Sequence, residues 1–248
     1  METTSKPLPG AWSLITDSWK LFTSTWNTSI KTSSLLIYVG LAYFVGGLLM
    51  KVNENLAVLS GVISLGATIF TAWITIRVLL TMLKLEAGQQ PTPAADEAKK
   101  AWSLLIPLFW VGFLTGLVVL GASLLLILPG IYFGVALYFS QLVLIDQGTR
   151  GTQALGASRA LVRGRWWGTF GRMLAGGIVF GLAMGLAMSI ALGIVAMVGG
   201  SGSFDQNGAT DPLLLGIMQL VQMIVIAALM PLLSGFQVKM YRALQKTR

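Results

Sequence analysis

The stretch that decides the fold is AWSLLIPLFWVGFLTGLVVLGASLLLILPGIYFGVALYFSQLVLI, residues 101–145, in which none of the 45 side chains is charged. A helix needs about 20 apolar residues to cross the roughly 30 Å of hydrocarbon in a bilayer. The run is therefore long enough to cross twice, and its Leu128-Pro129-Gly130 segment is a strong turn signal. These features predict a hairpin of two membrane-spanning helices, at about 102–125 and 131–145, with its turn at 128–130.

Four other apolar runs flank this hairpin, and the composition agrees with them. Of all residues, 55% are hydrophobic and only 10% are charged, whereas about a quarter are charged in soluble domains. The mean hydropathy is +0.77. We therefore predict an all-α integral membrane protein, a six-transmembrane-helix bundle that forms a single membrane domain over residues 1–248. Its remaining spans are expected at about 33–50, 56–80, 173–198 and 213–238.

Basic residues indicate the orientation of these spans. With six spans, sixteen of the seventeen Lys and Arg residues fall on one side, and only Lys51 falls on the other. The loop 199–212 on that second side carries Asp205 and Asp211 and no basic residue. Because cytoplasmic loops are enriched in Lys and Arg, both termini are predicted to be cytoplasmic. The first 34 residues lack a signal-peptide pattern, so we expect the spans themselves to direct insertion.

Amphipathic segments precede some of the spans on the basic side. In segment 10–27, Trp12, Ile15, Trp19, Phe22 and Trp26 recur at steps of three and four, which predicts one apolar helical face lying on the inner leaflet. Segments 94–102 and 151–168 have a similar character. The chain is thus interpreted as three repeats of an interfacial helix followed by a hairpin. Alternatively, each hairpin carries its own anchor of Trp and basic residues without any repeat.

The segment 151–168 concentrates charge in a chain that otherwise avoids it. Arg159, Arg163 and Arg165 point away from an Ala and Leu face and are followed by Trp166 and Trp167. Arginine binds phosphate and tryptophan favours headgroup depth, so these five residues form a candidate site for anionic lipid headgroups. The competing interpretation is that the arginines serve as topology signals only. In either case the net charge of +8 favours membrane lipids, a membrane-protein partner or a second copy over nucleic acid.

Other polar and small residues suggest contacts between helices. Asp146, at the end of the fourth span, is expected to pair with an arginine of segment 151–168. Arg77 is interpreted as a topology anchor rather than an anion site. Polar residues inside spans include Gln141, Gln219 and Gln222, which are expected to bond between helices or, alternatively, to line a cavity.

Small residues at every fourth position of the fifth span predict packing within the bundle rather than a dimer face. They are Gly177, Gly181, Gly185, Ser189 and Gly193.

The residue inventory argues against enzymatic function. The chain contains no His and no Cys, which removes the commonest general base, thiol nucleophile and metal ligands. No span contains a pair of carboxylates, and no glycine-rich loop is followed by the lysine that a phosphate-binding loop requires. We therefore expect no enzyme, no cofactor and no metal.

One region resembles a known family. The segment LPGIYFGVALYFSQLVLIDQGTRGTQALGASRALVRGRWW is similar to the YciC-type uncharacterised bacterial inner-membrane proteins and to the membrane domain found beside some glycerophosphodiester phosphodiesterases. The resemblance implies the six-span fold and an inner-membrane location in bacteria, and it implies no reaction. The residues that carry it are Pro129, Gly130, Ile131, Asp146, Ala157, Ser158, Leu161 and Trp167.

These observations lead to two hypotheses about function. The first is a non-enzymatic integral inner-membrane protein that organises envelope lipid or partner proteins. The alternative is a transporter or flippase for an amphiphile with an anionic headgroup. A cleft lined by Arg77, Gln141 or Gln219 would favour the alternative, and a closely packed bundle would favour the first.

Overall fold

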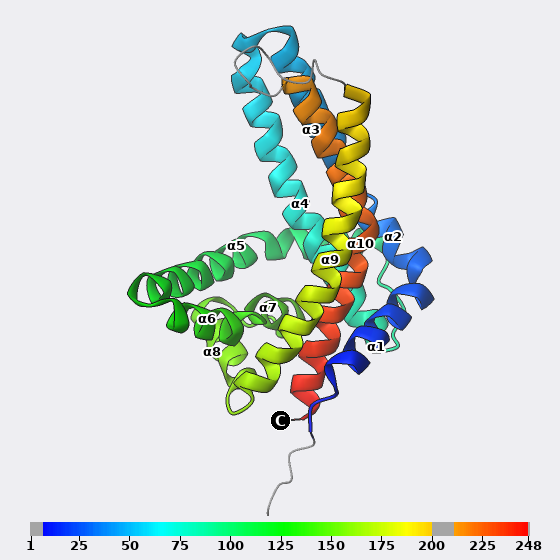
Figure 1. Cartoon of the computed structure of the whole chain (residues 1–248). Coiled ribbons are helices and arrows are strands. Elements are labelled where there is room, and N and C mark those ends of the chain that lie inside the picture. Colours follow the sequence, from blue (N-terminus) through cyan, green and yellow to red (C-terminus); the bar gives the residue numbers. More distant parts are fainter. Residues whose placement is uncertain (1–6, 200–210, 248) are drawn as a thin grey trace, which may run out of the picture. The chain divides into compact units, whose positions relative to one another are not determined.

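The computed structural model describes residues 7–199 and 211–247, and every regular element in these residues is helical. The predicted loop 199–212 therefore lies, apart from its ends, outside the described residues. Figure 1 shows the helices in sequence colours. In chain order they are α1 (Ala11–Ser24), α2 (Trp26–Ser33), α3 (Leu36–Val52), the short 3₁₀ helix η1 (Glu54–Leu56), α4 (Ala57–Glu86), α5 (Ala94–Leu125), α6 (Ile127–Leu137), α7 (Ser140–Gln147), α8 (Gly151–Val162), α9 (Trp166–Gly199) and α10 (Pro212–Lys246).

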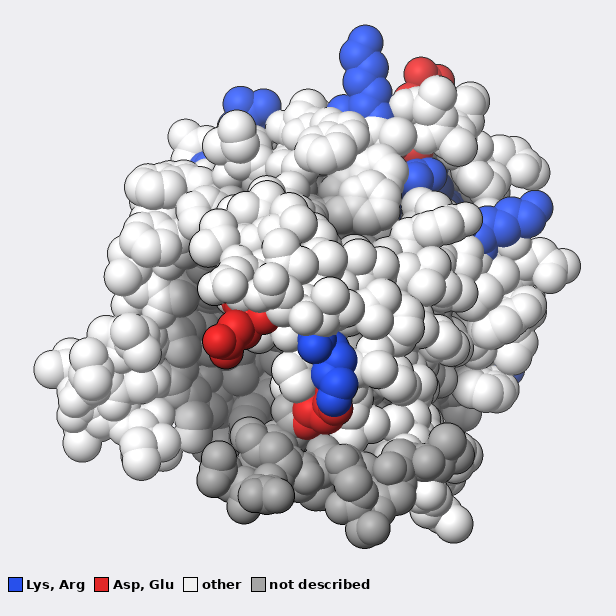
Figure 2. Space-filling view, turned by 90° about the horizontal axis from the view of Figure 1, so that it is seen from above, with Lys and Arg blue, Asp and Glu red and all other residues white. Residues whose placement is uncertain are grey.

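Six helical stretches are long and apolar enough to cross a membrane. The predicted all-α fold with six such helices is confirmed, and the chain is a multi-pass membrane protein. Large apolar side chains, from Val58 on α4 to Leu186 on α9, lie exposed along these helices, as lipid-facing residues do. Figure 2 shows the molecule from above, where uncharged residues cover most of the described surface and a few basic and acidic side chains stand among them. The stretches are Trp26–Val52, Glu54–Glu86, Ala94–Leu125, Ile127–Gln147, Trp166–Met197 and Pro212–Lys246.

The chain divides into two compact units, each built from several segments. Unit 1 consists of Met1–Thr25, Leu79–Val179 and Leu232–Arg248, and unit 2 consists of Trp26–Val78 and Phe180–Pro231. Among the described basic residues, only Lys31, Lys51 and Arg77 belong to unit 2. Unit 1 therefore contains nearly all of the positive charge, and unit 2 consists mainly of apolar helix.

In unit 2, α3 packs closely on the first half of α10 because glycines bring the two backbones together. A Cβ atom at Gly40 would lie 3.0 Å from Cα of Leu220, and one at Gly216 would lie 3.0 Å from Cα of Phe44. Gly47 faces Gly216 in the same way, since its Cβ would lie 3.1 Å from Cα of Gly216. Such distances leave no room for a side chain, so these glycines allow the close helix contact that is common in membrane proteins.

At one end of unit 2, an ion pair joins the turn after α3 to the start of α10. The ammonium of Lys51 contacts the carboxylate of Asp211, whose other oxygen accepts a hydrogen bond of 2.8 Å from the backbone N–H of Leu213. Lys51 and this N–H hold the pKa of the Asp211 carboxyl below its usual value. The pair is thus formed above the ordinary aspartate pKa and is lost as the pH falls through the lowered one.

The small-residue stripe of the fifth span does not make the predicted contacts. A Cβ atom at Gly177, Gly181, Gly185 or Gly193 would meet no described atom within 4 Å, and Ser189 is exposed. Instead, the neighbouring face of α9 contacts α10 in unit 1, where Gly176 lies against the ring of Phe236. Within each unit, the described residues of the stripe therefore lack the predicted contacts with other helices, and the dimer face stays the alternative interpretation.

In unit 1, α5 and α6 form the predicted hairpin, but the turn lies earlier in the sequence. The chain reverses at Leu126, the only residue between the two helices, which has extended φ and ψ angles of −161° and 147°. Pro129 lies in the first turn of α6, where its missing N–H costs nothing. Gly130 contributes to packing rather than to the turn, since its Cβ would lie 3.0 Å from Cα of Ser123 on α5.

The fourth span is broken at Tyr138 and Phe139, and a residue of α8 closes the break. The hydroxyl of Ser158 accepts a hydrogen bond of 3.2 Å from the backbone N–H of Phe139 and donates one of 2.8 Å to the carbonyl of Ala136. Ser158 and Phe139 are both fully buried. One side chain therefore satisfies two backbone groups that the interrupted helix leaves without partners.

The predicted interfacial helices differ from the structure in three respects. The N-terminal helix ends at Ser24, and its apolar face is divided: Ile15 and Phe22 are buried, whereas Trp12 and Trp19 are exposed. Segment 94–102 is continuous with α5, so the second of the three proposed repeats lacks a separate interfacial helix. In the third segment, α8 ends at Val162, and Trp166 and Trp167 open α9.

Ser158→Ala is expected to lower the free energy of unfolding by about 1–3 kcal/mol, because two buried backbone groups lose their partner. Thermal or denaturant unfolding of the purified protein in detergent measures this change. Ser103→Ala is the matched control, since Ser103 is exposed and bonds only to the carbonyl of Lys100 within α5. Equal stability of the two variants would show that the helix break does not depend on Ser158.

Candidate anion-binding site

The helix α8 presents two different faces. Its buried face contains Ala154, Leu155 and Leu161 together with Ser158, which is fixed to the broken fourth span. Arg159 and Arg163 are four positions apart, and both are exposed. Arg159 lies in the last turn of α8, and Arg163 is the residue that directly follows the helix. Because the buried face holds α8 in place, the two arginines are presented together on a fixed support.

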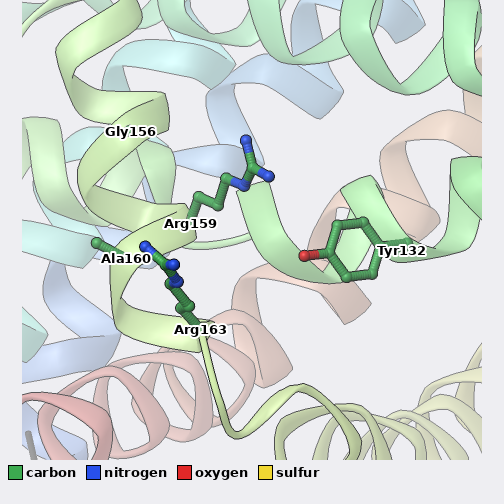
Figure 3. Close-up of a pocket in the computed structure, with 5 residues that line it drawn as sticks. All are labelled: Tyr132, Gly156, Arg159, Ala160 and Arg163. Atoms are coloured by element: carbon green, nitrogen blue, oxygen red, sulfur yellow. The ribbon is translucent and has the colours of Figure 1, made fainter.

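A pocket of about 350 Å³ lies between these arginines and α6. Its lining consists of Gly156, Arg159 and Ala160 from α8, of Arg163 directly after the end of α8, and of Tyr132 from α6. Figure 3 shows the hydroxyl of Tyr132 directed from α6 toward the side chains of α8. Gly156 has no atom within 4 Å of the position that a Cβ would occupy, so this part of the lining is open. The pocket thus combines two guanidinium groups with one hydroxyl.

Aromatic side chains fix the α6 wall of the pocket. The indole N–H of Trp166 donates a hydrogen bond of 3.1 Å to the carbonyl of Tyr132, and the two rings stack with centroids 5.8 Å apart. The guanidinium of Arg159 lies 5.9 Å from the ring centroid of Phe133. Trp167 meets Trp166 edge to face and is 78% exposed. Trp166 therefore orders the pocket, whereas Trp167 is available to the surroundings.

No acidic side chain of residues 7–199 or 211–247 is paired with either arginine. Within the described parts of the chain, neither Arg159 nor Arg163 forms an ion pair. Guanidinium groups bind phosphate and carboxylate oxygens through paired hydrogen bonds. Two of them beside a phenolic hydroxyl can hold an anion such as a phosphate group.

The remaining arginines of this segment are used within the protein. The guanidinium of Arg165 donates to the hydroxyl and the carbonyl of Thr247 near the C-terminus. Arg172 donates to the carbonyls of Leu8 and Pro9, at 3.0 and 2.6 Å, and to Gly168 in its own helix. The prediction that Arg165 joins Arg159 and Arg163 at a headgroup is therefore corrected: Arg165 fastens the chain end to the start of α9.

Asp146 forms the predicted ion pair, but with a different helix. Both of its oxygens accept hydrogen bonds of 2.9 Å from the guanidinium of Arg242 on α10, not from an arginine of α8. The hydroxyl of Tyr241 donates a third bond of 3.0 Å. Gln147 donates to this hydroxyl at 2.9 Å. A paired Arg–carboxylate contact of this geometry is strong and directional, so it fixes the end of the fourth span to α10.

The same arginine connects a third helix. The Nε atom of Arg242 lies 3.6 Å from the carboxylate of Glu86 at the end of α4, whose side chain is only 8% exposed. Lys239 and Lys246 lie 3.7 and 3.9 Å from this carboxylate. Arg242 thus bridges two acidic residues, and the ends of α4, α7 and α10 meet at a largely shielded charge cluster in unit 1.

Other polar residues named from the sequence lie elsewhere. Arg77 is buried in unit 2, with its guanidinium 4.8 Å from the ring centroid of Trp73. Gln219 and Gln222 are exposed on α10. Gln141 lines a cavity in unit 1. Sequence reasoning missed Tyr132 as a pocket residue, and the only available signal was its place three residues after Pro129 in the segment that resembles a family.

Asp146→Asn is expected to destabilise the protein by about 1.5–3 kcal/mol, because hydrogen bonds to a charged group are lost and Arg242 keeps an unbalanced charge. Unfolding in detergent measures the change. Asp17→Asn is the control, since Asp17 is exposed and lies 4.0 Å from Lys20 on the same helix, and such pairs contribute little. A loss no larger than that of Asp17→Asn would refute the structural role of the cluster.

No family model, curated protein or solved structure matches this chain. The resemblance of residues 128–167 to YciC-type membrane proteins therefore stays a prediction. The function must be argued from the geometry of the site itself.

Proposed function

We propose that this chain is a non-enzymatic membrane protein that binds anionic lipid headgroups through Arg159, Arg163 and Tyr132 and thereby organises envelope lipid or partner proteins. The observation that carries the proposal is the pair of arginines that line one pocket without an acidic partner. Arginines placed only to set topology need no shared pocket and no hydroxyl beside them. The proposed ligand group is the phosphate of an anionic lipid.

The surroundings of the pocket agree with a site at the membrane surface. Trp167 is exposed beside it, and tryptophan rings favour headgroup depth. Each basic residue near an anionic leaflet contributes about 1 kcal/mol. Two arginines then contribute about 2 kcal/mol, which corresponds to roughly thirtyfold in affinity.

The double variant Arg159→Gln/Arg163→Gln is expected to bind phosphatidylglycerol about thirtyfold more weakly than the wild type. Native mass spectrometry of the purified protein measures this binding, with phosphatidylcholine as the zwitterionic comparison. Raising the salt concentration should weaken phosphatidylglycerol binding to the wild type, because the attraction is screened over about 8 Å at physiological ionic strength.

Lys99→Gln/Arg150→Gln is the matched control. It removes the same charge from exposed positions in the same unit and leaves the pocket lining unchanged. We expect it to retain most of the phosphatidylglycerol binding. If both double variants lose binding equally, net charge rather than the pocket attracts the lipid, and the proposal is wrong.

We further propose that the protein lies in a bacterial inner membrane with both termini in the cytoplasm. The near-complete separation of basic residues supports this orientation, together with the resemblance described above. Lys51 and Asp211, both assigned to the external side from the sequence, lie in contact at one end of unit 2. Their contact agrees with this orientation, because two residues on the same side of the membrane must lie at the same end of the unit.

Single cysteines test the orientation in intact cells. Asn55→Cys is expected to react with an impermeant thiol reagent, and Gln153→Cys is expected to react only after permeabilisation. Both positions are exposed, and the natural chain has no cysteine to interfere. Labelling of Gln153→Cys but not of Asn55→Cys before permeabilisation would reverse the proposed orientation. Ser158 is unsuitable as a probe because its side chain is buried.

Transport of an anionic amphiphile is the second candidate, and one observation favours it. Gln141 lines a cavity, and the transporter hypothesis expects a cleft beside this residue. However, the residues that line this cavity include no Lys or Arg, and an anion moved into an apolar environment without a cation is strongly disfavoured. Headgroup binding at the surface is therefore the function that the geometry supports best.

A further inference from the structure

The cavity beside Gln141 is a second polar feature of unit 1, separate from the arginine pocket. It has a volume of about 300 Å³ and lies between α5, the broken fourth span and α10. Four of its side chains can form hydrogen bonds, and none is charged. They are Thr115 from α5, Tyr138 and Gln141 from the fourth span, and Gln237 from α10.

These four side chains share an unusual property, which is that their polar groups have no partner in the protein. Among the described residues, no hydrogen bond is made by the hydroxyl of Tyr138 or by the amides of Gln141 and Gln237. The hydroxyl of Thr115 is buried and also has no partner. The amide of Gln141 lies beside Gly112, where a Cβ would be in ordinary contact with its Nε2 atom at 3.5 Å.

An unpartnered polar group is unfavourable at this depth. The cavity lies in the uncharged run 101–145, and Gly112 is about 18 Å along α5 from Lys100, the last charged residue before it. In hydrocarbon no solvent satisfies such groups. The hydroxyl of Thr115 is buried, Gln141 and Gln237 are half-buried, and Tyr138 is exposed at the cavity. Four such groups around one cavity favour a polar occupant, and a lining without charge favours a neutral one.

We infer that this cavity binds the uncharged, hydroxyl-bearing part of a neutral lipid, of which a diacylglycerol is the simplest example. Two amides and two hydroxyls can donate to ester carbonyls and accept from a free hydroxyl. The exposed apolar surface of α5 around the cavity, which includes Phe109 and Phe113, can contact the acyl chains. This inference does not depend on the arginine pocket, because no residue lines both sites.

The test uses the purified protein and two probes that differ at one glycerol position, which bears a free hydroxyl in dioleoylglycerol and a third oleoyl ester in trioleoylglycerol. Dioleoylglycerol is expected to form a one-to-one complex in native mass spectrometry and to raise the melting temperature, whereas trioleoylglycerol, which lacks a free hydroxyl, is not. The variant Gln141→Leu/Gln237→Leu should bind dioleoylglycerol at least about tenfold more weakly, because two hydrogen-bonding side chains are removed. Phosphatidylglycerol binding should be unchanged, which separates this site from the arginine pocket.

Gln219→Leu/Gln222→Leu is the matched control, since it makes the same substitutions at exposed positions of α10 and should bind dioleoylglycerol as the wild type does. If the cavity variant does not fold, Thr115→Val removes one hydroxyl at nearly constant shape, and it should also weaken binding. Equal affinity of the wild type for both probes, or undiminished binding by the variants, would overturn the inference. Failure of dioleoylglycerol to bind would also overturn the inference. The cavity, which has room for about ten water molecules, would then hold only solvent.

Discussion

Backbone hydrogen bonding in hydrocarbon is the constraint on which the rest of this structure depends. A chain that crosses a membrane must satisfy its N–H and C=O groups internally, so each apolar run becomes a helix. The fourth span is interrupted within its uncharged run, between α6 and α7. This interruption is tolerated because the Ser158 hydroxyl bonds to the backbone N–H of Phe139 and to the carbonyl of Ala136. The same contact holds α8 in position and so determines where Arg159 and Arg163 lie.

Hydrocarbon also limits where charged side chains can lie. Apart from Lys31, Lys51 and Arg77, the described basic residues belong to unit 1, and they have distinct roles there. Arg242 binds Asp146 and approaches Glu86, and Arg165 and Arg172 fasten the two ends of the chain. Arg159 and Arg163 have no acidic partner among the described residues. The proposed anion site therefore consists of two cations that the fold does not use in ion pairs and that line one pocket.

Glycine has a different role on different helices. Gly40, Gly47 and Gly216 allow α3 and α10 to approach closely. The regular series on α9 has no such contact in either unit, although it was the more conspicuous pattern in the sequence. Because small residues also occur on faces that touch lipid, their spacing alone does not reveal which face packs. Gly176, one position from the series, makes the actual contact with Phe236.

The sequence alone determined that the protein is all-helical, that six helices are long enough to span a membrane, and that most of the positive charge belongs to a few connecting segments. Length, hydropathy and charge are local properties, so they can be read along the chain. Only the tertiary structure decided that Asp146 pairs with Arg242, that Arg165 is occupied by Thr247, and that Tyr132 faces the arginine pocket. These contacts join residues on different helices, and they depend on the rotation and depth of each helix. Neither quantity is fixed by apolar sequence, because lipid accepts any apolar face.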